Sequence, residues 1–152
     1  GIERFGLYEP LLQLTLLSHA GLPILLGLFL VINAPLLLVM IVCFLVHEAV
    51  GYLDIRWATH RRGVRPVEQR VHDYLTAVPF AALSMVVMLH WEELLLLVQQ
   101  PIEALRQPLQ LRTPPLAPGI VGTILGLIFV GNIIPYLEGL LRSWRYRVRA
   151  PA

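Results

Sequence analysis

Apolar residues occur in four long runs along the chain, at about 11–31, 36–53, 66–98 and 119–141. A hydrocarbon core about 30 Å thick needs about 20 apolar residues in a helix, and each run reaches or approaches that length. The inside of a bilayer offers no water to hydrogen-bond the backbone, so runs of this kind are expected to be α-helices. The pattern predicts an all-α integral membrane bundle of four transmembrane helices, forming one domain over residues 1–152.

Short polar segments separate the runs. Residues 32–35 predict a tight turn, and residues 54–65 predict a short loop. Pro66 suits the first turn of the third helix, which is longer than one bilayer thickness and should therefore project from the membrane or bend at Pro79. The proline-rich connector at 99–118 leaves room for a short interfacial helix over 102–106.

Composition supports lipid as the solvent, because 57% of the residues are hydrophobic and only 14% are charged. All twelve basic residues are arginine, and ten of them fall at the N-terminus, in the 54–65 region with Arg70, or in the C-terminal tail. Only Arg106 and Arg112 lie in the connector. The positive-inside rule therefore predicts both termini and the 54–65 loop in the cytoplasm, with the connector on the outer, periplasmic side of a bacterial inner membrane. The arginines are then topology determinants that contact anionic membrane lipids, and nucleic-acid binding is not expected.

Ionisable residues cluster near the predicted cytoplasmic ends of the second and third helices. His47 and Asp54 are seven residues apart, nearly two turns, so they share one helix face with Gly51 between them. Glu68 and His72 share a face of the third helix in the same way. If the two helices are antiparallel neighbours, we expect the two histidines at similar depth and the two carboxylates in a second layer nearer the water.

Two imidazoles over two carboxylates predict a metal site made by His47, Asp54, Glu68 and His72. This donor set suits iron, zinc or manganese, and helical bundles build such sites from facing helices. Iron is the metal that we expect, with a di-metal centre as a variant. Further candidate ligands, or partners that orient an imidazole, are Glu48, His60, Asp73 and Glu138. We expect His60 to fold back over the helix ends.

Three functions are compatible with these residues. The first is a non-haem iron oxidoreductase acting on a lipid-like substrate that enters from the bilayer. The second is a haem b electron-transfer subunit, with His47 and His72 as axial ligands, Gly51 making room for the ring, and Arg61 and Arg62 holding the propionates. The third is an accessory or transport subunit of a larger membrane complex or a homo-oligomer, in which the polar cluster serves assembly or the passage of protons or metal.

A purely structural alternative also exists, since polar side chains in membrane bundles hydrogen-bond neighbouring helices, typically for about 0.6 kcal/mol. His19 is expected to make such a bond, to act as a proton relay or to be an extra ligand, and His90 with Trp91 marks the outer interface. Gly122 and Gly126 form a small-residue face suited to helix packing.

The pattern of His47-Glu48, Asp54, His60-Arg61, Glu68-Gln69 and His72-Asp73 resembles the histidine-box membrane hydroxylases and desaturases. The chain departs from them in having five histidines and no HxxxH or HxxHH box, so carboxylates would have to replace imidazoles in a di-iron centre. The stretch from His47 to Trp91 is also similar to uncharacterised four-span bacterial inner-membrane proteins, a resemblance that implies no activity. The sequence contains no phosphate-binding loop, nucleophile elbow or HExxH motif.

Overall fold

The computed structural model describes residues 8–61 and 65–149, and for residues 8–10, 61, 68, 142, 143 and 146–149 it describes the backbone alone. This part of the chain is helical apart from its connections. The elements are α1 (Tyr8–Phe29), α2 (Ala34–Arg61), α3 (Pro66–Leu89), α4 (Trp91–Gln99), α5 (Pro101–Arg106), α6 (Pro118–Ile128), the π-helical segment η2 (Phe129–Ile133) and α7 (Ile134–Arg149).

Four helical segments are long and apolar enough to cross a membrane: Leu11–Phe29, Ala34–His60, Gln69–Leu89 and Pro118–Leu141. Their outward surfaces are strongly apolar, since Met88 and Leu89 are 76% and 79% exposed and Leu127 is 69% exposed. A monomer in water rarely exposes so much contiguous apolar surface, whereas lipid tails accept it. The all-α prediction with four membrane-length helices is confirmed.

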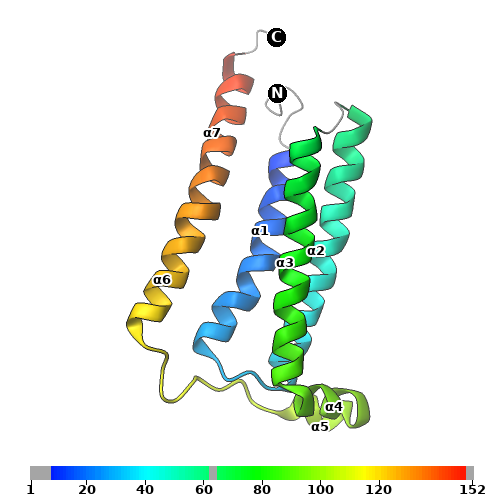
Figure 1. The fold of residues 1–152 in the computed structure, drawn as a ribbon, viewed down its shortest axis with the longest axis vertical. Coiled ribbons are helices and arrows are strands. Elements are labelled where there is room, and N and C mark those ends of the chain that lie inside the picture. Colours follow the sequence, from blue (N-terminus) through cyan, green and yellow to red (C-terminus); the bar gives the residue numbers. More distant parts are fainter. Residues whose placement is uncertain (1–7, 62–64, 150–152) are drawn as a thin grey trace.

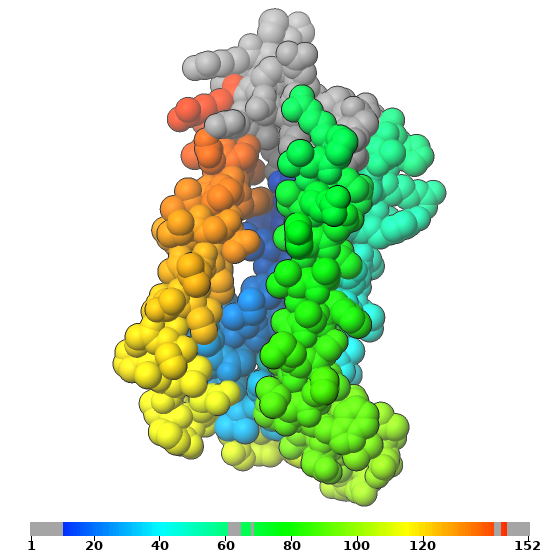
Figure 2. All heavy atoms as spheres, viewed as in Figure 1, coloured from blue at the N-terminus to red at the C-terminus, as the bar shows by residue number. Residues whose placement is uncertain are grey.

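The spans run alongside one another, with the start of α1, the end of α2, the start of α3 and the end of α7 at one end of the molecule (Figure 1). We call this the arginine-rich end. Helices α4 and α5 and the connector lie at the opposite end. Helix α2 packs on both α1 and α3, while α7 packs along α1. The fourth span is attached more loosely than the others, with an opening visible between it and α3 in Figure 2.

One face of α2 forms the centre of the bundle. Its buried side chains recur every three or four residues, or at twice that spacing, as expected for one helix face: Leu37, Met40, Cys43, His47, Asp54 and Ala58. We call this set the buried stripe of α2. His47 and Asp54 are only 5% and 2% exposed. They are the two polar residues of a stripe whose other members are apolar.

Two helix boundaries differ from the sequence prediction. Helix α2 continues to Arg61, so most of the predicted 54–65 loop is helical and Asp54 lies within the helix. No proline or glycine occurs between Asp54 and Gly63, which explains the extension beyond the apolar run. Helix α3 ends at Leu89, not near Val98, because the backbone turns at His90 before α4 begins. Its 24 residues already span about 36 Å at about 1.5 Å per residue, enough for a bilayer.

Hydrogen bonds join the connector to the turn between α1 and α2. The backbone N–H of Ala34, at the start of α2, donates to Glu93 Oε2 at 2.9 Å and lies 3.2 Å from Gln107 Oε1. The side-chain amide of Asn33 donates through Nδ2 to the Pro108 carbonyl at 2.9 Å. An isolated antiparallel β-bridge pairs Leu30 with Leu111. These bonds satisfy backbone groups that the helix ends would otherwise leave unpaired.

The fourth span contains the π-helical segment η2, which the sequence pattern did not reveal. Pro135 lacks an N–H, so the carbonyl of Gly131 receives no bond from the residue four positions later. The N–H of Ile134 instead donates to the carbonyl of Phe129, five residues earlier. The helix path remains continuous from α6 to α7.

Candidate functional site

A carboxylate and an imidazole from facing helices meet near the arginine-rich end. Asp54 Oδ2, on the buried stripe of α2, lies 3.8 Å from His72 Nε2 on α3. The Asp54 side chain is 3% exposed and the His72 side chain is 19% exposed, so the pair is largely screened from water. Burying an ionised carboxylate is costly unless charged or hydrogen-bonding groups compensate it. This contact is therefore a specific feature of α2–α3 packing.

His47 contacts both neighbouring helices through its ring. Its Nδ1 atom lies 3.1 Å from the Leu16 carbonyl on α1, and its Nε2 atom lies 3.2 Å from the Leu75 carbonyl on α3. A carbonyl only accepts hydrogen bonds, so a neutral imidazole, with one N–H, can donate to one of them at a time, and an imidazolium can donate to both. His47 connects α1, α2 and α3 at a single level of the bundle.

Pro79 explains why the Leu75 carbonyl is open to His47. In an uninterrupted helix this carbonyl would accept from the N–H of residue 79, but proline has none. An unpaired carbonyl away from water is costly, and His47 Nε2, when it carries the ring proton, can supply the missing donor. The sequence predicts that Pro79 can bend the helix. It also signals, through the four-residue spacing, that the Leu75 carbonyl is open, and that consequence was missed.

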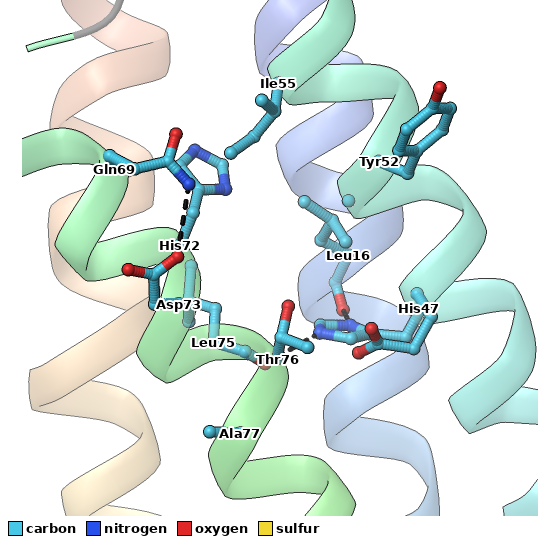
Figure 3. Close-up of a pocket in the computed structure, with 12 residues that line it drawn as sticks. Leu16, His47, Tyr52, Ile55, Gln69, His72, Asp73, Leu75, Thr76 and Ala77 are labelled. Atoms are coloured by element: carbon cyan, nitrogen blue, oxygen red, sulfur yellow. Dashed lines mark hydrogen bonds between the residues drawn. The ribbon is translucent and has the colours of Figure 1, made fainter.

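The two histidines are offset along the bundle. His47 lies opposite Leu75, and His72 lies opposite Asp54, so the imidazoles lie at different levels (Figure 3). The offset is about one helical turn counted along α3 and nearly two turns counted along α2. The predicted arrangement of a histidine layer over a carboxylate layer is therefore not observed. The reason is the packing register of the two helices. His47 lies beside Leu75, three residues after its expected partner His72, and Asp54 lies beside His72, four residues after its expected partner Glu68.

A cavity of about 460 Å³ lies beside these residues, between α2 and α3 and next to Leu16 of α1. We call it the polar cavity. It brings together polar side chains from two helices: His47, Glu48, Tyr52, Gln69, His72, Asp73 and Thr76. Figure 3 shows His47 and Thr76 at one level of this cavity and His72 with Gln69 at the other. Tyr52, Gln69 and Thr76 were not among the predicted site residues, because only the helix register brings them together.

Glu48 contributes a carboxylate oxygen that needs a partner. Its Oε1 atom is buried and has no hydrogen-bond partner among the described residues, although the residue as a whole is half-buried. The other acid of this cavity, Asp73, is exposed and accepts a hydrogen bond of 3.1 Å from Gln69 Nε2. Glu48 is therefore the acid of the polar cavity that is poised to receive a hydrogen-bond donor or a cation.

The remaining predicted residues are more scattered. His60 is exposed, and its Nδ1 bonds to the Arg56 carbonyl of its own helix at 2.6 Å, so it does not fold back over the helix ends as expected. Glu138 is exposed on α7, which packs along α1. Glu68 lies in the first turn of α3, but its side chain, like that of Arg61, is outside the described residues, as is all of Arg62.

The space beside Gly51 is used by α1. A Cβ atom at Gly51 would lie 3.7 Å from Leu16 Cδ2, an ordinary packing distance. His47 and Gly51 thus meet the same part of α1, the histidine through the Leu16 carbonyl and the glycine through the Leu16 side chain. A haem ring placed beside Gly51 would have to displace that side chain.

Among the described side chains, no three His, Cys, Asp or Glu residues converge in a group that could hold a metal ion. The Asp54–His72 pair supplies two such groups, and Glu68 remains the predicted third. Comparison with protein families, curated proteins and solved structures finds no match to this chain.

Proposed function

We propose that this chain is a small membrane protein that binds a transition-metal ion, preferably iron, at Asp54 and His72 and uses it in oxidation–reduction chemistry on a lipid-like substrate. The observation that carries the proposal is the approach of the buried Asp54 carboxylate to His72 Nε2 at 3.8 Å. A carboxylate and an imidazole from facing helices are the donors that iron, zinc and manganese sites in helical bundles use.

The rest of the coordination sphere would come from Glu68 and from water or substrate in the polar cavity. Glu68 is four residues before His72 in α3, and His72 lines the cavity. A site with two or three protein ligands keeps positions open, as catalytic metal sites do. Under the predicted topology, this site faces the cytoplasmic side of the membrane.

The test is metal analysis and absorption spectroscopy on the detergent-purified full chain. Wild type should contain near-stoichiometric metal, and Asp54→Asn and His72→Ala should each lose at least about 90% of it. His60→Ala is the matched control, because it removes an exposed imidazole from the same end of the bundle and should retain the metal. Wild-type protein that folds, is supplied with iron, zinc and manganese, and still binds none of them contradicts the proposal.

An accessory or transport subunit is the second candidate, and the His47 contacts favour it. A ring whose two nitrogens face carbonyls of α1 and α3 serves helix assembly without any metal. In that case the Asp54 and His72 variants should lower stability or subunit association and leave metal content at background in every sample.

A haem b subunit with His47 and His72 as axial ligands is distinguished by the same spectra, since bound haem gives a Soret band. His47 would first have to release the Leu16 and Leu75 carbonyls, and the two imidazoles would have to overcome an offset of one to two helical turns. The non-haem metal site requires neither change.

A further inference from the structure

A second cavity of about 350 Å³ lies between α1, α2 and α3, farther from the arginine-rich end. We call it the apolar cavity. Apart from His19 and His47, its lining is apolar and includes Pro23, Gly27, Met40, Phe44, Pro79 and Ala82. His19 already bonds through Nδ1 to the Thr15 carbonyl at 2.8 Å. The interior of this cavity therefore suits hydrocarbon, and its volume falls within the usual range of ligand pockets, about 300–1,000 Å³.

The two cavities share one lining residue, His47. Their other lining residues follow one another along the same helices. On α3, Thr76 and Ala77 line the polar cavity and Val78 and Pro79 line the apolar cavity. On α1, Leu16 lines the polar cavity and His19, three residues later, lines the apolar cavity. A molecule passing His47 would thus have a polar surrounding at one end and an apolar surrounding at the other.

The polar end offers a specific partner. Glu48 Oε1 is buried beside the polar cavity and has no partner among the described residues. A carboxylate oxygen accepts hydrogen bonds, so the group that satisfies it must be a donor. A hydroxyl or an amine fits this requirement, whereas an ester or a bare hydrocarbon end does not.

We propose that the two cavities bind one long-chain amphiphile, with its hydrocarbon chain in the apolar cavity and a hydroxyl or amine end beside Glu48. The occupant comes from the bilayer, because the apolar cavity is formed by segments of membrane-spanning helices. Lipid tails are as apolar as the cavity wall, so moving the hydrocarbon chain from the bilayer into the cavity gains little free energy. The polar end of the amphiphile therefore provides the selectivity among ligands. This inference rests on the proposed function only in identifying the amphiphile as the substrate, since its binding needs no metal.

The test uses the full chain in lipid nanodiscs and hexadecanol carrying a photoactivatable diazirine on its chain, with crosslinks mapped by peptide mass spectrometry. Crosslinks are expected on residues that line the apolar cavity, such as Met40 and Phe44. Unlabelled hexadecanol or hexadecylamine should compete at least about tenfold better than hexadecane, which has no donor; the better of the two polar competitors identifies the end group. Glu48→Leu should abolish that preference.

Ala82→Phe should fill the apolar cavity and lower its crosslinking at least about fivefold. Ala81→Phe is the matched control, because Ala81 is the adjacent residue of α3 and is not in the cavity lining. Crosslinks spread over the lipid-facing surface without competition would overturn the inference, as would cavity crosslinking that persists unchanged in a folded Ala82→Phe protein. The wild-type competition decides the matter if Ala82→Phe does not fold.

The metal-site variant Asp54→Asn separates this inference from the proposed function. Cavity crosslinking that persists in Asp54→Asn, or in wild type found to bind no metal, supports the amphiphile site independently of the metal. A wild-type protein that binds metal but shows no competed crosslinks overturns the amphiphile site and leaves the metal proposal standing.

Discussion

His47 Nε2 lies 3.2 Å from the carbonyl oxygen of Leu75, at the position where Pro79 deprives that carbonyl of its helical hydrogen bond. A histidine of one membrane helix thus compensates a proline of the next. His47 also reaches the Leu16 carbonyl of α1, at 3.1 Å. A single imidazole thus contacts backbone carbonyls of both helices that pack against α2.

The first prediction concerns this compensation. Pro79→Ala gives residue 79 an N–H that can bond to Leu75, so His47→Ala should cost less free energy of unfolding in that background than in wild type. The expected coupling is about 0.6 kcal/mol and at most about 1.7 kcal/mol, the range measured for hydrogen bonds between membrane helices. Unfolding titrations of the four proteins in detergent provide the measurement. Pro23→Ala, the same change within α1, is the control and should show no coupling to His47→Ala.

The second prediction concerns the Asp54–His72 pair in the absence of metal. His72→Leu removes a positive or hydrogen-bonding group from beside a buried carboxylate and should cost about 1–3 kcal/mol. Adding Asp54→Leu removes the carboxylate itself, so the double variant should be less destabilised than the sum of the single variants. His60→Leu, at an exposed position, should change stability by less than about 0.5 kcal/mol. Strict additivity of the two single variants would show that the pair is not energetically coupled.

The third prediction concerns the start of α2. Glu93 accepts a hydrogen bond from the Ala34 N–H, as an N-cap side chain would, although it comes from α4. Glu93→Ala should lower stability by about 1 kcal/mol, and Glu93→Ala with Gln107→Ala should lower it further, because Gln107 Oε1 is the second acceptor. Thermal unfolding in detergent measures both. Glu92→Ala removes an exposed neighbouring carboxylate and should have little effect.

The fourth prediction concerns the glycine face of α6. A Cβ atom at Gly122 or Gly126 would meet nothing within 4 Å, so among the described residues this face is not packed against another helix. The sequence predicts that the face serves helix packing, and we expect its partner to be a helix of a second copy, so Gly122→Leu with Gly126→Leu should leave the fold intact and lower self-association in chemical crosslinking. Gly21→Leu, at an equally open glycine of α1, is the control. Unchanged crosslinking in the α6 variant would exclude a homo-oligomer built on this face.

The fifth prediction concerns orientation. In a Cys43→Ala background, a cysteine at Arg65 should resist a membrane-impermeant thiol reagent applied to intact cells, and a cysteine at Glu103 should react with it. The positive-inside rule gives this expectation, because Arg65 lies at the arginine-rich end and Glu103 lies at the opposite end. The reverse labelling pattern would contradict the predicted cytoplasmic position of the candidate site.

The all-α architecture followed from the sequence because backbone groups in a bilayer must be satisfied within each segment. Each of the four apolar runs is long enough to form such a segment, and each overlaps a helix that is long and apolar enough to cross a membrane. The short α5 also lies where the connector predicted an interfacial helix.

The helix boundaries were harder to predict than the helices themselves. The end of α3 depends on a backbone turn at His90, whereas the apolar pattern of the sequence continues past that residue.

The candidate site was predictable only in part. The residue types and their shared helix faces were readable, since seven residues on one helix return nearly to the same side. The pairing across helices was not, because it depends on how far α3 slides along α2. That register sets His72 beside Asp54 and leaves His47 to the Leu75 carbonyl.

By itself, the sequence determined the helical elements, four of them long and apolar enough to cross a membrane, and the helix faces that carry ionisable groups, because these depend on local hydrogen bonding and periodicity. Only the tertiary structure decided which groups meet, that the Leu75 carbonyl left open by Pro79 lies beside His47, and that His47 lines both a polar and an apolar cavity. Those features arise from the relative displacement of helices distant in sequence, a quantity that no single segment encodes.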